Sequence, residues 1–213
     1  MRNPGWTGAL VLVLVATVGC TSSRKEKHAA AKAALAEGLE GGVLVFSDDF
    51  EREAVGDKWL DRSGKWEIKD GWLHGRGIKN EGLWLNPPLP ERVRVEFDAK
   101  AGTDEGDLKF EIFNTEQRHQ TGYIVIFGGW HNAVSIIARL NEHGEDRKEA
   151  GVHVEKGRVY HFAAVRTDNN LRWFVDGELV LQWPDDDPIR GHVFGFNNWA
   201  ADTLFDNVKV FQL

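Results

Sequence analysis

The sequence predicts an all-β domain in which two antiparallel sheets pack face to face. The segments Val93 to Lys100 and Leu108 to Phe113 alternate apolar and polar residues, which is the period of a strand with one buried face. An Asp-Gly pair at 176–177 separates two further strand-like segments and is typical of a tight hairpin. No helical repeat of apolar residues occurs beyond residue 43, so the short strands must cover one another in a two-sheet sandwich.

Residues 1–20 have the pattern of a secretory signal rather than of a folded element. One basic residue, Arg2, precedes an apolar run from Ala9 to Val18, which is about half the ~20 residues that span a bilayer. The run leads to Cys20, the only cysteine, in a context that resembles a bacterial lipobox. We expect Cys20 to be lipidated and the protein to be a cell-envelope lipoprotein, held in the outer membrane because no aspartate follows the cysteine. An ordinary cleaved signal and an uncleaved anchor are the alternatives.

Residues 21–42 are expected to be a tether. They are rich in alanine, lysine and glutamate, which favour helix, but they lack an apolar stripe that would dock on a core. The alternative is a helix packed on the domain. The domain itself is predicted to occupy residues 43–213.

The strands of this domain can be placed in order from alternation and turn residues. Beyond the two segments named above, we expect early strands at 66–69, 72–75 and 83–85 and late strands at 192–197 and 202–211. The segments 159–167, 171–175 and 178–183 are joined by short turns and predict a three-stranded meander.

The charge pattern excludes several classes of partner. The net charge is −7, and no stripe of lysine and arginine is present to neutralise phosphates, which argues against nucleic acid. No glycine-rich phosphate loop and no zinc-like spacing of His and Cys occurs, so we expect neither a nucleotide nor a cofactor.

Three segments resemble the concanavalin A-like lectin and glucanase superfamily, particularly its LamG-like members. They are YHFAAVRTDNNLRWFVDGELV at 160–180, GHVFGFNNW at 191–199 and FDNVKV at 205–210. The pairing of FSDDFE at 46–51 with WEIKDGWLHG at 66–75 is similar to the start of the 3-keto-disaccharide hydrolase domain family. The resemblance implies a jelly roll whose curved sheet holds carbohydrate on its concave face.

The glucanase members of that superfamily carry three acidic residues on one strand, and this chain matches them only in part. In EIFNTE, Glu111 and Glu116 occupy the outer positions but Phe113 replaces the central acid. Retaining hydrolysis needs two carboxyl groups about 5 Å apart, and a spacing of five places these two on opposite faces of a strand. Glu111, expected on one face with Lys109 and Phe113, and His131 are the candidate catalytic groups.

Two strand ends combine tryptophan with carboxamides. Sugars bind to such pairs because a ring face stacks on indole while hydroxyl groups bond to amides. The predicted sugar site comprises the 130–132 corner, the 197–199 corner and one nearby arginine: Trp130, His131, Asn132, Arg139, Asn197, Asn198 and Trp199. The alternative for both tryptophans is packing in the core or at its rim. His161 alternates with Val159 and Ala163 and is expected to be a core residue.

A structural calcium ion is a further hypothesis. Asp48 and Asp49 near the start of the domain would meet Asp206 and Asn207 near its end if the terminal strands pair, and oxygen atoms are the ligands that calcium prefers. Solvated turns are the alternative.

Together these patterns predict a lipid-anchored, extracytoplasmic domain that binds a carbohydrate or glycan. The first alternative is a glycoside-cleaving enzyme of the 3-keto-disaccharide hydrolase type. The second is a structural envelope protein, which would have no concave aromatic cleft.

Overall fold

The computed structural model describes residues 1, 26, 29, 33–34 and 36–213 of the chain. The chain divides after Ala36, and the second unit, Glu37–Leu213, is compact. The apolar run 9–18 and Cys20 lie outside the described residues. None of the helices in the described part of the chain is both long and apolar enough to cross a membrane.

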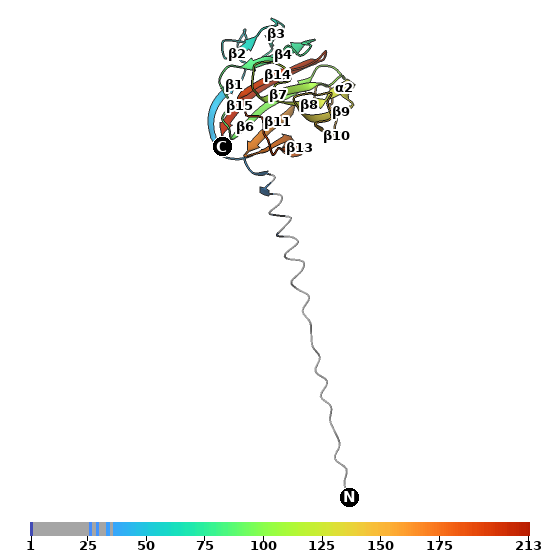
Figure 1. Cartoon of the computed structure of the whole chain (residues 1–213). Coiled ribbons are helices and arrows are strands. Elements are labelled where there is room, and N and C mark those ends of the chain that lie inside the picture. The colour runs from blue at the N-terminus through green and yellow to red at the C-terminus, as the bar shows by residue number, and fades with distance from the viewer. Residues whose placement is uncertain (2–25, 27–28, 30–32, 35) are drawn as a thin grey trace. The chain divides into compact units, whose positions relative to one another are not determined.

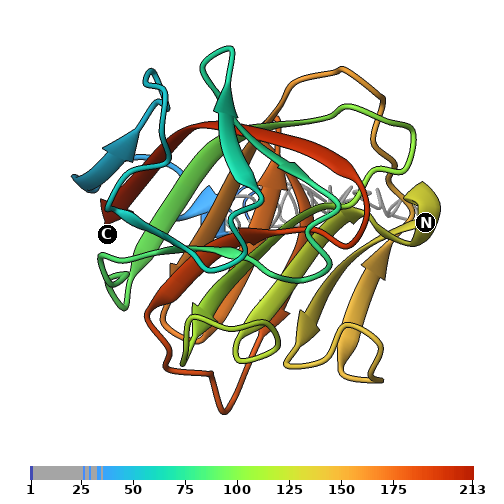
Figure 2. The same ribbon diagram turned by 90° about the horizontal axis from the view of Figure 1, so that it is seen from above.

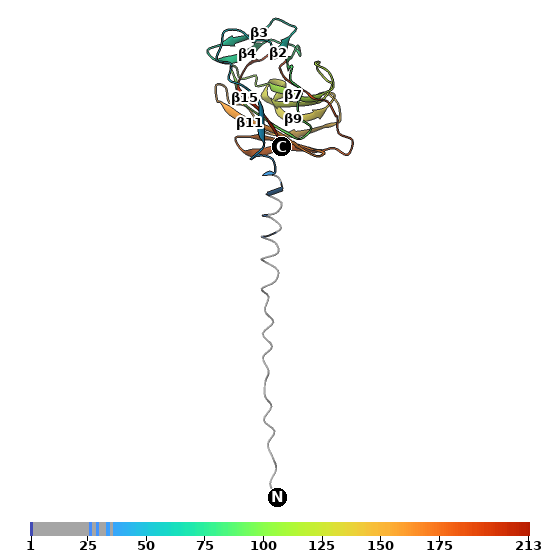
Figure 3. The same cartoon turned by 90° about the vertical axis from the view of Figure 1, so that its left-hand side faces the viewer.

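Two antiparallel sheets form the compact unit, as predicted (Figure 1). In the first sheet the strands follow one another as β13 (Glu178–Pro184), β12 (Asn170–Val175), β11 (Tyr160–Thr167), β6 (Val93–Ala101), β15 (Asp202–Gln212), β4 (Trp72–Arg76) and β3 (Trp66–Lys69), and β1 (Val43–Asp48) also pairs with β15. In the second sheet the order is β10 (Arg147–Ala150), β9 (Val134–Arg139), β8 (Tyr123–Gly128), β7 (Leu108–Asn114), β14 (Val193–Asn197), β5 (Leu83–Leu85) and β2 (Trp59–Asp61). Figure 3 shows β11 and β15 in one layer and β7 and β9 in the other.

The core lies between the sheets and is dominated by phenylalanine. Phe97 on β6 is fully buried and contacts the rings of Phe162 on its own sheet and of Phe110 and Phe196 on the facing sheet. These rings come from the apolar positions of the alternating segments, so the period of two places one face of each strand in the core.

The predicted connections are also present. β11, β12 and β13 are neighbours, and the turn between β12 and β13 has positive φ at Asp176 (52°) and Gly177 (80°), as a tight hairpin requires. The terminal strands β1 and β15 pair in antiparallel fashion, and the long β15 curves across the sandwich in Figure 2.

Two expectations about the outer face of the first sheet need correction. His161 is exposed there, with Nδ1 2.8 Å from Asp98 Oδ1, because the group that covers Ala163 on the same face of β11 does not include a cover for His161. That group includes Leu39 and Leu213, which pack on Ala163, Val165 and Phe174. Part of the expected tether therefore belongs to the compact unit.

Candidate functional site

The second sheet carries charged residues on the face that points away from the core. On β7 the side chains of Phe110 and Ile112 enter the core, which turns Lys109 and Glu111 to the opposite face. Strand pairing sets Glu111 beside Gly195 and Ile124, and Lys109 beside Asn197 and Ile126. Both charged side chains are almost fully buried, because the loops at the ends of the strands fold over them.

A pocket of about 370 Å³ lies above Lys109 on this face. It is lined by residues from six connections, strands or turns: Asn80, Glu105, Asp107, Lys109, Trp130, His131, Glu142, His143, Trp199, Ala200 and Ala201. Trp130 is 36% exposed and Trp199 56% exposed, so both indoles present open surface beside it. The two Trp-containing corners predicted from the sequence therefore meet at one pocket.

The Trp-His-Asn corner is a strained turn between β8 and β9, within α2 (Gly129–Asn132). Trp130, His131 and Asn132 have φ values of 50°, 59° and 60°, a left-handed conformation that is costly for residues with a Cβ atom. The Asn132 side chain holds the turn, since its Nδ2 donates to Val154 O (2.7 Å) and its Oδ1 accepts from Val154 N (2.8 Å). In this left-handed turn, Trp130 and His131 line the pocket.

Buried charges form the floor of the pocket. Lys109 Nζ lies 3.0 Å from Glu142 Oε2, 2.9 Å from Asn80 Oδ1 and 4.0 Å from Asp107 Oδ1. Burial raises the pKa of Asp107, although Lys109 and a hydrogen bond from Trp199 N (2.6 Å) oppose the shift. The two carboxylates of the floor thus differ in their pairing, because Glu142 has a close ammonium partner and Asp107 has a more distant one.

Beside this floor, Glu111 holds His119. Glu111 Oε1 accepts from His119 Nδ1 (2.6 Å) and Asn197 Nδ2 (2.8 Å), and Oε2 accepts from Asn114 Nδ2 (2.9 Å) and Gln120 N (3.1 Å). Burial of Glu111 opposes ionisation, but these donors, His119 foremost, outweigh it and lower the pKa of the carboxyl group. The other nitrogen of His119, Nε2, is 3.9 Å from Glu142 Oε1, so the imidazole links the two glutamates.

His119 also lines a second, smaller hollow of about 180 Å³ on the same face. Trp84 and Asn80 line it too, and Asn80 is shared with the Trp130–Trp199 pocket. A Cβ atom on Gly195 would lie 2.4 Å from the Trp84 ring, so glycine is needed there for the indole to rest on the sheet. Asn80 is the residue that lines both hollows.

The remaining predicted site residues do not line the pocket. Asn197 binds Glu111, and Asn198 is buried with hydrogen bonds to Ile78 N, Gly75 O and Thr203 Oγ1, so these carboxamides organise the strand end. Arg139 bonds instead to Asp185 and to the carbonyl of Asp187.

Glu111 itself lies under the pocket, with both oxygens occupied. Its expected neighbour Phe113 is not on its face, because Phe113 has a φ of 58° and points into the core. Glu116 is exposed and pairs with Arg118 at 3.3 Å, so the two glutamates occupy unlike surroundings.

Asp107, His119, Glu142 and His143 were not predicted as site residues. They lie on loops where no alternation or motif marks them, and only the fold brings them together.

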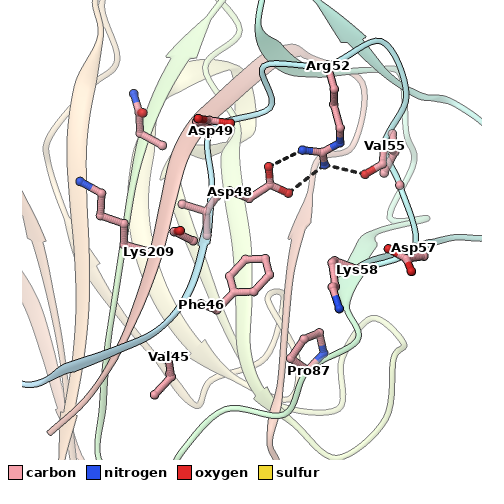
Figure 4. A pocket seen from close by; sticks show the side chains of 14 residues that line it. Val45, Phe46, Asp48, Asp49, Arg52, Val55, Asp57, Lys58, Pro87 and Lys209 are labelled. Carbon is pink, nitrogen blue, oxygen red and sulfur yellow. Dashed lines mark hydrogen bonds and ion pairs between the residues drawn. The ribbon is translucent and has the colours of Figure 1, made fainter.

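A different hollow, of about 900 Å³, lies between β1 and the loop 52–58 (Figure 4). Asp48, Asp49 and Asn207 line it, as the calcium hypothesis requires. However, Asp48 accepts hydrogen bonds from Arg52 (2.5 and 2.8 Å) and from Trp59 Nε1 (2.7 Å), drawn in part in Figure 4. Within the described part of the chain, no group of three or more His, Cys, Asp or Glu is placed to hold a metal ion. Calcium binding at these residues stays an untested hypothesis.

Comparison with solved structures identifies the fold as the concanavalin A-like jelly roll. A carbohydrate-binding module, CBM66, from Bacillus subtilis superposes with a TM-score of 0.61 at 16% identity and covers 75% of this chain and 98% of its own. A non-specific endo-β-1,3(4)-glucanase of family GH16 has a TM-score of 0.59 at 14% identity, with 82% and 96% covered. A laminarinase from Flavobacterium sp. UMI-01 has a TM-score of 0.58 at 13% identity, with 80% and 100% covered. At such identities the likeness concerns the fold alone. Comparison with models of protein families and with curated proteins finds no match.

Proposed function

We propose that this protein binds a carbohydrate in the pocket between Trp130 and Trp199. The observation that supports this best is the pair of open indoles from two separate turns beside one pocket whose floor is polar. Indole surfaces stack on the apolar faces of sugar rings, while carboxylates and carboxamides bond to the hydroxyl groups. The strained turn that displays Trp130 and His131 supports the same proposal, since strain of this kind concentrates at functional sites.

The similar solved structures support this proposal through their fold. They include a carbohydrate-binding module and glucanases, which share the jelly-roll fold. A purely structural envelope protein would not need two open indoles beside a polar pocket, so the site argues against that alternative.

A glycan array screened with the full chain tests the proposal, followed by titration of the best glycan. Binding should weaken in Trp130→Ala and in Trp199→Ala. Trp72→Ala is a matched control, because Trp72 lies on the first sheet, away from the pocket, under the ammonium of Lys100. Binding of wild-type strength in both pocket variants would refute the proposed site.

Glycoside cleavage is a second candidate, favoured by the two unlike carboxylates. Asp107 Oδ1 and Glu142 Oε2 lie 4.0 Å and 3.0 Å from one ammonium, so these atoms are no more than 7.0 Å apart. Hydrolases place two carboxyl groups roughly 5 to 9.5 Å apart, one as acid and one as base or nucleophile. The raised pKa of Asp107 suits an acid, and the ion-paired Glu142 suits the other role.

In this proposal Asp107 and Glu142 take the catalytic roles that the sequence suggested for Glu111 and His131. Glu111 lies below the pocket, and His131 remains only a residue of the lining. If the chain is an enzyme, Asp107→Asn should abolish release of sugar from the bound glycan, including a 3-keto-glycoside, while binding persists. Turnover that is unchanged in Asp107→Asn and Glu142→Gln would exclude this pair.

We also infer a lipid anchor at Cys20 and a place in the bacterial envelope, from the sequence alone. The apolar run before Cys20 is short for a spanning helix, and a lipid chain would hold the secreted domain at a membrane surface.

A further inference from the structure

The pocket between Trp130 and Trp199 has an excess of negative charge. Three carboxylates line it, those of Glu105, Asp107 and Glu142, and the only ammonium in its lining is that of Lys109. Lys109 is 1% exposed and its Nζ is already in contact with Glu142, Asn80 and Asp107. It is therefore engaged below the pocket and has little capacity left for an anionic ligand.

The imidazole and guanidinium groups near the pocket also have carboxylate partners. His131 Nδ1 is 2.5 Å from Glu105 Oε2, and His143 Nε2 is 3.7 Å from Glu142 Oε1. The guanidinium of Arg147 lies 5.2 Å from the Trp130 ring centroid, but it pairs with Glu149 at 2.6 Å and donates to Glu142 O at 2.9 Å. With both imidazoles neutral, the lining holds three carboxyl groups against one ammonium.

One buried acceptor in the lining lacks a hydrogen bond. Glu142 is 5% exposed, and its Oε2 accepts no hydrogen bond within the described structure, although the Lys109 ammonium is 3.0 Å away. Asp107 Oδ2 accepts from Trp199 N, whereas its Oδ1 has only the ammonium at 4.0 Å. Glu142 Oε2 is closed off beside the Lys109 ammonium, so Asp107 Oδ1 is the oxygen that favours a ligand that donates.

We propose that the sugar bound in this pocket carries a protonated amine, as in an unacetylated amino sugar, and that sugars bearing a carboxylate or sulfate are rejected. This inference rests on the carbohydrate-binding function proposed above and adds the class of ligand. An ammonium group can donate a charge-assisted hydrogen bond to Asp107. A uronate would meet three carboxylates without a free cation, and its desolvation would not be offset.

The test compares disaccharides that share a β-1,4 linkage and differ in one substituent. They are built from glucosamine, glucose or glucuronic acid, and each is titrated calorimetrically into the full chain at neutral pH, where the amine is mainly protonated. One added charge pair at about 4 Å contributes at least ~1 kcal/mol, so the glucosamine compound should bind about fivefold more tightly than the glucose compound or better. The glucuronic acid compound should bind most weakly, and added salt at about 0.5 M should reduce the differences.

Variants that remove one carboxylate test whether the acidic lining causes the order of the three affinities. Asp107→Asn and Glu105→Gln should each bring the three affinities closer together by several-fold, and the exposed Glu105 keeps the test open if Asp107→Asn does not fold. Glu116→Gln, an equal charge change at an exposed site outside the pocket lining, should leave the order unchanged.

Each outcome has a defined meaning. Equal affinities, tightest binding of the glucuronic acid compound, or an order that neither variant alters would overturn the amino-sugar inference while leaving carbohydrate binding intact. If no glycan binds in these titrations or on the array, the proposed function fails and this inference fails with it.

Discussion

Replacing Trp199 with alanine should weaken glycan binding strongly and leave the fold nearly unchanged. Trp199 is 56% exposed, and its hydrogen bonds are made by its backbone, from Trp199 N to Asp107 Oδ2 and from Lys79 N to Trp199 O. If a sugar ring covers roughly 70 Å² of this surface at about 25 cal/mol per Å², the lost stabilisation is about 1.8 kcal/mol. The dissociation constant should therefore rise roughly twentyfold.

The assay combines calorimetric titration with a thermal melt of each variant. Trp173→Ala is the matched contrast, because Trp173 is fully buried and its truncation should cost about 3 to 5 kcal/mol of folding free energy. Trp130→Ala should show a smaller binding loss than Trp199→Ala, since Trp130 is 36% exposed and supported by His143. A Trp199→Ala protein that melts far below the wild type would show that this indole is a packing residue, and the reasoning would be refuted.

Three further predictions concern the fold, the buried carboxylate and the anchor. Gly177→Val should lower stability by about 1 to 3 kcal/mol through its positive φ alone, because no atom lies near the added Cβ; an unchanged melting temperature would contradict this. Since the pKa of Glu111 is lowered on folding, its ionised form stabilises the protein above its ordinary pKa of 4.5, and this contribution is lost as the pH falls below that value. Glu111→Gln should therefore be less stable than wild type near neutral pH by about 1 to 3 kcal/mol, with the difference shrinking in acid; a difference independent of pH in chemical denaturation would rule out the charge as its cause. Cys20→Ser should release the protein from the membrane fraction or leave the precursor uncleaved, and unchanged partition and mass would exclude lipidation.

Alternation and turn residues were sufficient to predict most of the fold. The strand β6 begins at Val93 as expected, and the hairpin at Asp176 and Gly177 has the predicted backbone angles. These features depend on neighbours in the sequence, which is why a single sequence reveals them. The strand β10 was missed because Arg147–Ala150 has no apolar alternation and pairs at a sheet edge.

The site residues that could be predicted are those that stand among other candidate binding residues within a few positions of the sequence. Trp130 and Trp199 stand in unusual corners, and both do line the pocket. Asn198 shares the second corner but is buried, because the bonds that hold this turn need a carboxamide. Sequence composition alone cannot separate a carboxamide that supports a turn from one that contacts a ligand.

The acidic floor could not be predicted, because it depends on contacts between distant segments. Lys109 lies on β7 and Glu142 in the loop after β9, and no periodicity relates their positions. The sequence places Lys109 on the outward face of a strand, and only the fold shows that it is buried and therefore needs carboxylate partners. The ammonium lies 3.0 Å from Glu142 but 4.0 Å from Asp107, so Asp107 is the less well neutralised of the two. This unequal pairing by Lys109 is the reason that we propose a positively charged sugar for the open part of the pocket.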